Sequence, residues 1–494
     1  MLASRDPDQR EETRLKRHRI LISALAAAAL LAPAAASAST PSHADAVAAL
    51  QEARAAFAGE LSSGGAPDRD PTLALRDLAV ALPALKGADR REATDLLSRP
   101  TDKKDRDYFG KEAAGSPVCD ANFCVHWTDE KKNAPVSNDF IGEVQASVTT
   151  SYGIENDTLG WQRAKSDGSK GARNGVGGDG QVDVYITNLG KQLYGFAAPD
   201  PGQNGSRRYA YLVLDNDYRG FPSTPLDSLK VTVAHEYNHV LQFNYDTYQD
   251  LWLFEDTATW MEEQVYPEIN DYINYLPAFA KGTEVPMTGT DIKIYSEATF
   301  NHWLSGHYGQ AAVRDVWAAS QAGVNPKHLA TAAYTAGVTA NGGRPFADEF
   351  GDFAAATAEW NSSPYFPDAQ VYPEVRRRGT LGKNPQKVTL DNTSFRLVKV
   401  RAGGGPVTLK VKAQKGTTST IALVGRTGPV DGGTVTTALK QLPKGGTGTV
   451  TLDDTSGFSR VTAAIINSDG RSKGFSHGQR RYSGDNSKYK YSLG

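Results

Sequence analysis

Two histidines four residues apart, His235 and His239, most constrain the fold of this chain, because with the residues between them they form the sequence H-E-x-x-H. Residues i and i+4 lie on one face of a helix, so both imidazole rings can reach a single metal ion. Thr224 can cap such a helix, and Pro225 suits its first turn. Apolar residues at helical spacing predict its buried face: Leu226, Leu229, Val233, Tyr237 and Val240. We therefore expect a buried helix over residues 225–243 that presents a metal-binding pair.

The glutamate after the first histidine, Glu236, has the position of a general base that acts on a metal-bound water molecule. A catalytic zinc site usually has three protein ligands and keeps a fourth position for water. Zn²⁺ in such a site lowers the pKa of its water and polarises the scissile carbonyl group of a peptide. Candidates for the third ligand lie in residues 251–263, with the sequence LWLFEDTATWMEE.

The W-L-F-E sequence of residues 252–255 resembles the W-L-x-E-G-x-A segment of gluzincins such as aminopeptidase N and its relatives, with Asp256 in place of the glycine. The resemblance implies that Glu255 is the third zinc ligand. Glu262 lies about two helical turns further on the same face, so we expect it to orient a ligand histidine. An alternative makes Glu262 itself the ligand. Glu263 is expected to be solvated.

A second resemblance concerns residues 294–304, IYSEATFNHWL, which are similar to a helix start in relatives of aminopeptidase N. It implies that Tyr295 donates a hydrogen bond to the tetrahedral oxyanion. The alternative is that Tyr295 only packs a helix end. The G-x-M-E-N segment with which those enzymes grip a free amine does not occur before His235, which disfavours cleavage of N-terminal residues. Zincins bind an extended substrate along an edge strand, for which we expect residues 194–197, with 210–214 as the alternative.

Composition divides the chain into four parts. Residues 1–38 combine a basic start, an uncharged run over 20–32 and an A-x-A ending, which predicts a cleaved signal peptide, secretion and no membrane anchor. Residues 39–106 have helical spacing and form either an inhibitory propeptide or a helical brace. Strand patterns followed by helix patterns over 107–380 predict an α+β fold, which the gluzincin resemblance implies is zincin-type. Short β-prone runs over 385–494 predict a β-sandwich.

Three further expectations concern single residues and charge. Cys119 and Cys124 are expected to form a disulfide because export brings them into an oxidising environment, with a free pair as the alternative. Asp167, Asp179 and Asp183 lie in or beside a Gly-rich loop and could hold a structural Ca²⁺, although an ordinary loop explains them too. The formal net charge of −2 provides no broad basic field, so we expect no nucleic-acid partner.

Over residues 107–494 the chain resembles a family of secreted bacterial metalloproteases of the gluzincin type, within the peptidase-MA-like superfamily. The resemblance implies a zinc-dependent endopeptidase that acts on a protein or peptide substrate. The alternative is a secreted adhesion or carbohydrate-binding protein with a vestigial zincin scaffold, in which the C-terminal β-sandwich binds the ligand. The complete set of ligands and base favours the peptidase, because binding alone does not require it.

Overall fold

The computed structural model describes residues 41–58, 71–171, 180–191, 193–289, 292–321, 328–401, 403–476, 479–482 and 485–494. The expected signal peptide at residues 1–38 lies outside the described residues. The described part has several sheets and many helices, which confirms the α+β prediction. A search of this part finds no helix with the length and apolar character needed to cross a membrane.

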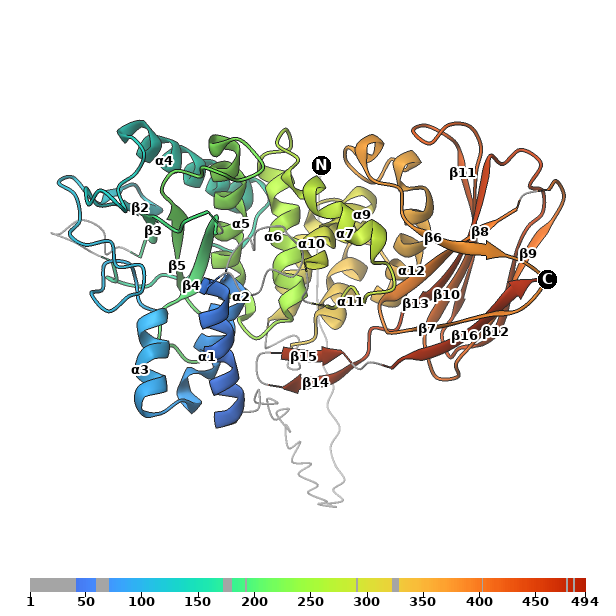
Figure 1. Cartoon of the computed structure of the whole chain (residues 1–494), viewed down its shortest axis with the longest axis horizontal. Coiled ribbons are helices and arrows are strands. Elements are labelled where there is room, and N and C mark those ends of the chain that lie inside the picture. The colour runs from blue at the N-terminus through green and yellow to red at the C-terminus, as the bar shows by residue number, and fades with distance from the viewer. Residues whose placement is uncertain are drawn as a thin grey trace, which may run out of the picture. The chain divides into compact units, whose positions relative to one another are not determined.

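Three N-terminal helices precede the first sheet: α1 (His43–Ala58), α2 (Thr72–Ala81) and α3 (Gly87–Leu96). Their buried leucines and alanines share a core with one face of that sheet, to which Tyr185, Phe196 and Tyr211 contribute. Helix α2 lies against strand β4 (Gly195–Pro199), as Figure 1 shows. The helical region at 39–106 is thus packed onto the following part of the chain.

The first sheet has five strands in the order β1-β2-β3-β5-β4. Besides β4 these are β1 (Val118–Cys119), β2 (Phe123–His126), β3 (Val182–Thr187) and β5 (Ala210–Asp215). Strands β2, β3 and β5 are parallel, whereas β1 and β4 run antiparallel to their neighbours. Strand β4 therefore forms an edge of the sheet, and β5 is internal.

Strands β1 and β2 form an antiparallel hairpin. The Asp120 carboxylate accepts hydrogen bonds from the backbone N–H groups of Asn122 and Phe123, which turns the chain. Cys119 and Cys124 are cross-strand partners in this hairpin, and they form the expected disulfide.

Two helices cover the other face of the sheet: α4 (Asn138–Tyr152) and α5 (Pro225–Asp246). The inward residues of this face include Val184, Leu212 and Leu214. Thr224 caps α5, because its hydroxyl accepts a hydrogen bond from the N–H of Asp227 at 3.2 Å. The capped helix is buried along nearly its whole length, which holds its histidines against the sheet.

A helical half follows α5. Its helices are α6 (Leu251–Val265), α7 (Leu276–Lys281), α8 (Lys293–Ser296), α9 (Ala298–Tyr308), α10 (Ala311–Ser320), α11 (Ala330–Ala340) and α12 (Phe346–Ala356). Helices α8 and α9 are separated at Glu297. The hydroxyls of Ser296 and Thr299 bond to backbone carbonyl groups three residues earlier, which competes with the helical hydrogen bonds at this point.

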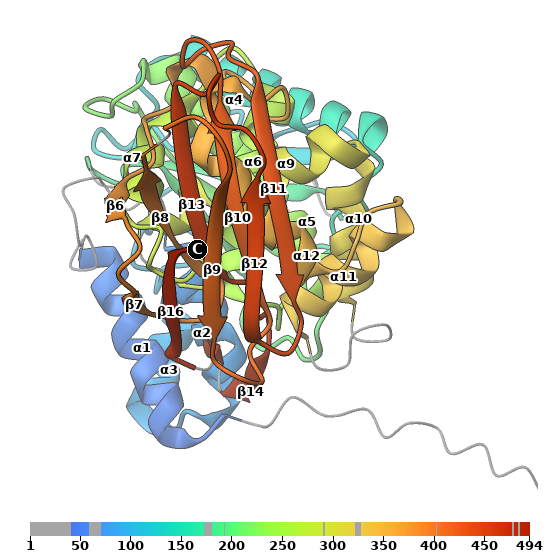
Figure 2. The same ribbon diagram turned by 90° about the vertical axis from the view of Figure 1, so that its right-hand side faces the viewer.

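The C-terminal region has two further sheets that share one core, which includes Leu409, Leu423 and Tyr489. The five-stranded sheet has the order β11-β10-β13-β8-β6 and packs on α12. The four-stranded sheet, β12-β9-β16-β7, faces the viewer in Figure 2. The strands are β6 (Arg377–Leu381), β7 (Gln386–Leu390), β8 (Ser394–Val400), β9 (Val407–Ala413), β10 (Ser419–Arg426), β11 (Val435–Leu442), β12 (Gly446–Leu452), β13 (Arg460–Asn467) and β16 (Ser487–Leu493), with β14 (Ser472–Ser476) and β15 (Gln479–Tyr482) as a separate pair.

Candidate metal centre

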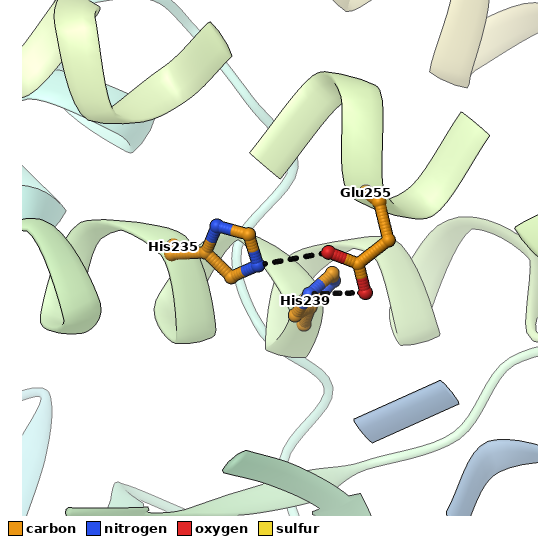
Figure 3. A group of neighbouring side chains, drawn as sticks. All are labelled: His235, His239 and Glu255. Atoms are coloured by element: carbon orange, nitrogen blue, oxygen red, sulfur yellow. Dashed lines mark hydrogen bonds and ion pairs between the residues drawn. The ribbon is translucent and has the colours of Figure 1, made fainter. Parts of the chain in front are cut away.

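Helices α5 and α6 bring together the three residues expected to bind zinc, as Figure 3 shows. His235 and His239 project from α5 toward Glu255 on α6. One carboxylate oxygen of Glu255 lies 3.2 Å from Nε2 of His235, and the other lies 3.6 Å from Nε2 of His239. One ligand atom from each residue lies within 4.8 Å of the other two, and all three side chains are buried.

The remaining ring nitrogens of both histidines have acceptors of their own. Nδ1 of His235 lies 2.8 Å from a carboxylate oxygen of Glu262, and Nδ1 of His239 lies 2.7 Å from the side-chain oxygen of Gln242. An Nδ1–H group that donates to these acceptors leaves Nε2 as the ligand atom on each ring. Two imidazole nitrogens fixed in this way, together with a carboxylate, are a donor set that fits Zn²⁺.

Glu262 has the place expected for a group that orients a ligand histidine, since it contacts the ring nitrogen that faces away from Glu255. Gln242 was missed in the sequence. It lies three residues after His239, on the same helix face, so helical spacing alone could have identified it.

The carboxylate of Glu236 lies beside a small hollow next to the histidines. The hollow has a volume of about 10 Å³ and is lined by Tyr194, Val231, Thr232, His235, Glu236 and Glu262. A single water molecule needs about 10–15 Å³ of such space. Glu236 is 2% exposed. In this form the site has room for little more than one water molecule and no peptide.

Thr72, the first residue of α2, lies between Glu236 and the edge strand β4. Its hydroxyl donates a hydrogen bond to Oε2 of Glu236 at 3.0 Å. The Thr72 hydroxyl oxygen in turn accepts a hydrogen bond from the backbone N–H of Ala197 on β4 at 2.9 Å. Thr72 thus connects the candidate base to the strand along which a substrate is expected to bind.

One helical turn after Thr72, Arg76 is completely buried beside α6. Its guanidinium group donates to the carbonyl oxygen of Gln249 and lies 5.6 Å from the ring centre of Phe254, the neighbour of Glu255. Its charge is paired with Asp77 at 3.1 Å. Burial raises the pKa of Asp77 to about 7, despite the attraction of Arg76.

Arg99, just after α3, binds the loop in which calcium was expected. Its guanidinium group pairs with Asp183 and lies 2.7 Å from carboxylate oxygens of both Asp167 and Asp200. Asp167 and Asp183 therefore share an arginine side chain in this structure, and Asp179 lies outside the described residues. These contacts make Arg99 a buried charged link between the residues after α3 and the first sheet.

Tyr295, in α8, lies near the histidines, with its ring centre 6.4 Å from that of His235. Of the two substrate strands considered, residues 194–197 overlap the edge strand β4, and Tyr194 lines the hollow. The alternative, residues 210–214, is wrong as an edge, because β5 is paired on both sides.

Two buried glutamates near the site were not predicted as such from the sequence. Glu263 is not solvated but only 6% exposed, and its burial, with Glu262 nearby, raises the pKa of its carboxyl group to about 9. Glu155 was missed. It is buried in a short π-helical segment after α4 and accepts a hydrogen bond from Asn238, between the two histidines, at 2.9 Å. No periodic pattern marks such a residue.

Comparison with known proteins adds one observation to this geometry. A search of curated proteins finds no match to the chain. Residues 222–406 are similar to a family of unknown function, described as DUF6055. The matched segment contains α5 and α6, and therefore His235, His239 and Glu255.

Proposed function

We propose that this protein is a secreted, zinc-dependent endopeptidase, with a zincin-type catalytic domain over residues 107–380 and a β-sandwich over 385–494. The observation that carries the proposal is the buried group of His235, His239 and Glu255, in which both Nε2 atoms face one carboxylate. Structural zinc sites usually have four protein ligands, whereas three ligands beside a glutamate are typical of a hydrolytic site.

A bound zinc ion supplies Lewis-acid polarisation of the scissile carbonyl group and acidifies water. Oε2 of Glu236, which now accepts a hydrogen bond from Thr72, accepts the proton of the attacking water and later delivers it to the leaving amine. The phenol of Tyr295 donates to the oxyanion. The N–H of Ala197 on β4, now bonded to Thr72, holds a carbonyl group of an extended substrate.

The helical region of residues 39–106 acts in this proposal as an inhibitory propeptide. Thr72 takes up hydrogen-bonding positions on Glu236 and Ala197 that a substrate needs. Arg76 and Arg99 hold the region in place through buried contacts. Between Arg99 and the first sheet the chain exposes Lys103, Lys104 and Arg106, a segment accessible to a processing protease.

The alternative is an adhesion or carbohydrate-binding protein with a vestigial zincin scaffold. Glu262 and Gln242 fix the orientation of both histidines, and a scaffold that no longer binds a metal does not require such contacts. For this reason we favour the peptidase.

The purified protein is expected to contain about one zinc ion per chain, because the three ligands are already brought together. Elemental analysis measures this in the intact chain. Cleavage of casein is then measured after the helical region has been released, with a chelator and with zinc added back. Protein without zinc after reconstitution, or released protein that holds zinc but leaves casein intact, contradicts the proposal.

Replacing Glu255 by alanine is expected to weaken zinc binding by orders of magnitude, because the ligand itself is lost. Replacing Glu262 by alanine removes only the acceptor on His235 and is expected to weaken binding about 10- to 100-fold. Competition with a fluorescent chelator measures both affinities. The reverse order of severity assigns the ligand to Glu262.

Replacing Tyr295 by phenylalanine is expected to lower kcat about 100-fold while KM and zinc content stay nearly unchanged, because the hydroxyl acts only on the oxyanion. Steady-state kinetics with a peptide substrate tests this on the released protein. A variant with full kcat and a lower melting temperature shows instead that the hydroxyl only stabilises packing.

A further inference from the structure

The outer surface of the four-stranded C-terminal sheet is strongly cationic. Five lysines alternate with buried apolar residues on three of its strands: Lys387 on β7, Lys410 and Lys412 on β9, and Lys488 and Lys490 on β16. All five are exposed. We call them the lysine face. The four strands of this sheet contain no aspartate or glutamate in their sequences.

The register places like charges side by side. Lys490 is the direct cross-strand partner of Lys412 on one side and of Lys387 on the other. Strands lie about 4.8 Å apart, and like charges directly opposite each other destabilise a sheet. Within the described part of the chain, none of the five lysines has an ion pair. The arrangement therefore costs folding free energy that an anionic partner can offset.

The lysine face is also hollowed. A depression of about 650 Å³ is lined by four of the five lysines, together with Lys415, Gln414 and Thr389. Threonines lie opposite the β9 lysines on the neighbouring strand, Thr447 beside Lys412 and Thr449 beside Lys410. The surface thus offers lysine ammonium groups that can pair with anions and threonine hydroxyl groups that can form hydrogen bonds with neutral polar groups.

We propose that the lysine face binds a linear anionic polysaccharide. Alternate residues along a strand are about 7 Å apart, so Lys410 with Lys412 and Lys488 with Lys490 form two parallel rows of charge suited to a polymer with regularly repeated anions. The threonine hydroxyls can bond to sugar hydroxyls. This function is independent of the metal centre. It means that the C-terminal region anchors the protein to an anionic polysaccharide.

Single-stranded nucleic acid fits the same face less well. Such ligands gain much of their affinity from stacking of bases on aromatic rings. The aromatic residues in the four strands are Tyr489 and Tyr491, and both are 2% exposed because they point into the core. The four strands also contain no arginine.

The test measures binding of the full chain to polygalacturonate, which carries a carboxylate on each sugar, with neutral dextran and single-stranded oligothymidylate as comparisons. We expect binding to polygalacturonate that weakens with salt, and no binding to dextran. The double variant Lys412→Gln/Lys490→Gln is expected to raise Kd about 10-fold or more, because two charge contacts with the polymer are lost. Its melting temperature should not fall, since two like-charge contacts are relieved.

The matched control is Lys399→Gln/Lys440→Gln, which removes two exposed charges from the five-stranded sheet and should leave Kd nearly unchanged. An equal loss in the control variant means that only net charge matters and overturns the proposal. Tighter binding of oligothymidylate than of polygalacturonate also overturns it, in favour of nucleic acid. Absence of polygalacturonate binding overturns it as well.

Discussion

Replacing Glu236 by glutamine is expected to lower kcat for peptide hydrolysis by about 10²- to 10⁴-fold, the contribution of a general base. An amide cannot accept the proton of the attacking water at the position now bonded to Thr72. Zinc content should stay at the wild-type level, because Glu236 is not among the three residues whose ligand atoms converge. Kinetics on the released protein, with elemental analysis, tests both parts.

The matched control is Glu263→Gln on α6. The Glu263 carboxyl group has a pKa of about 9, so it is already uncharged at neutral pH, and the amide replaces it without a change in charge. Its hydrolysis rate should stay near the wild-type value. Near-normal turnover in Glu236→Gln contradicts the assignment of the base, whatever the control shows.

Release of the helical region is expected to raise peptidase activity about 100-fold or more, if the closed form leaves about 1% of molecules or fewer open. The closed site offers a hollow of about 10 Å³, and Thr72 bonds both Glu236 and the edge strand. A recognition sequence for a site-specific protease, inserted between Lys103 and Arg106, allows cleavage in the intact protein. Casein hydrolysis is measured before cleavage, after it, and after separation of the fragments in high salt.

Cleavage alone should activate less than separation, because Arg76 and Arg99 keep the cut helical region bound. In the uncut chain, Thr72→Val removes a hydrogen bond to a charged group, which contributes about 1.5–3 kcal/mol, and should raise activity roughly 10-fold or more. A cleaved chain carrying Glu236→Gln serves as the control for the added protease. Equal activity of intact and separated protein refutes inhibition but leaves the zinc peptidase proposal standing.

Local periodicity identified the helices that carry the candidate metal ligands. The spacing of His235 and His239 predicted one helix face, and the cap at Thr224 predicted where that helix begins. The hairpin around Asp120 was missed, because one carboxylate that bonds two backbone N–H groups decides the turn and no periodicity marks it.

The sequence by itself determined the pair of histidines and the adjacent candidate base, Glu236, since helical spacing places these residues relative to one another. Glu255 followed from the resemblance of residues 252–255 to a gluzincin segment. Only the tertiary structure decided that Thr72 reaches Glu236, 164 residues further along the chain, and that Arg99 takes the carboxylates of Asp167 and Asp183. It also buried Glu263. These outcomes depend on which faces pack together. Such packing follows from the burial of apolar surface over the whole chain, which no local pattern records.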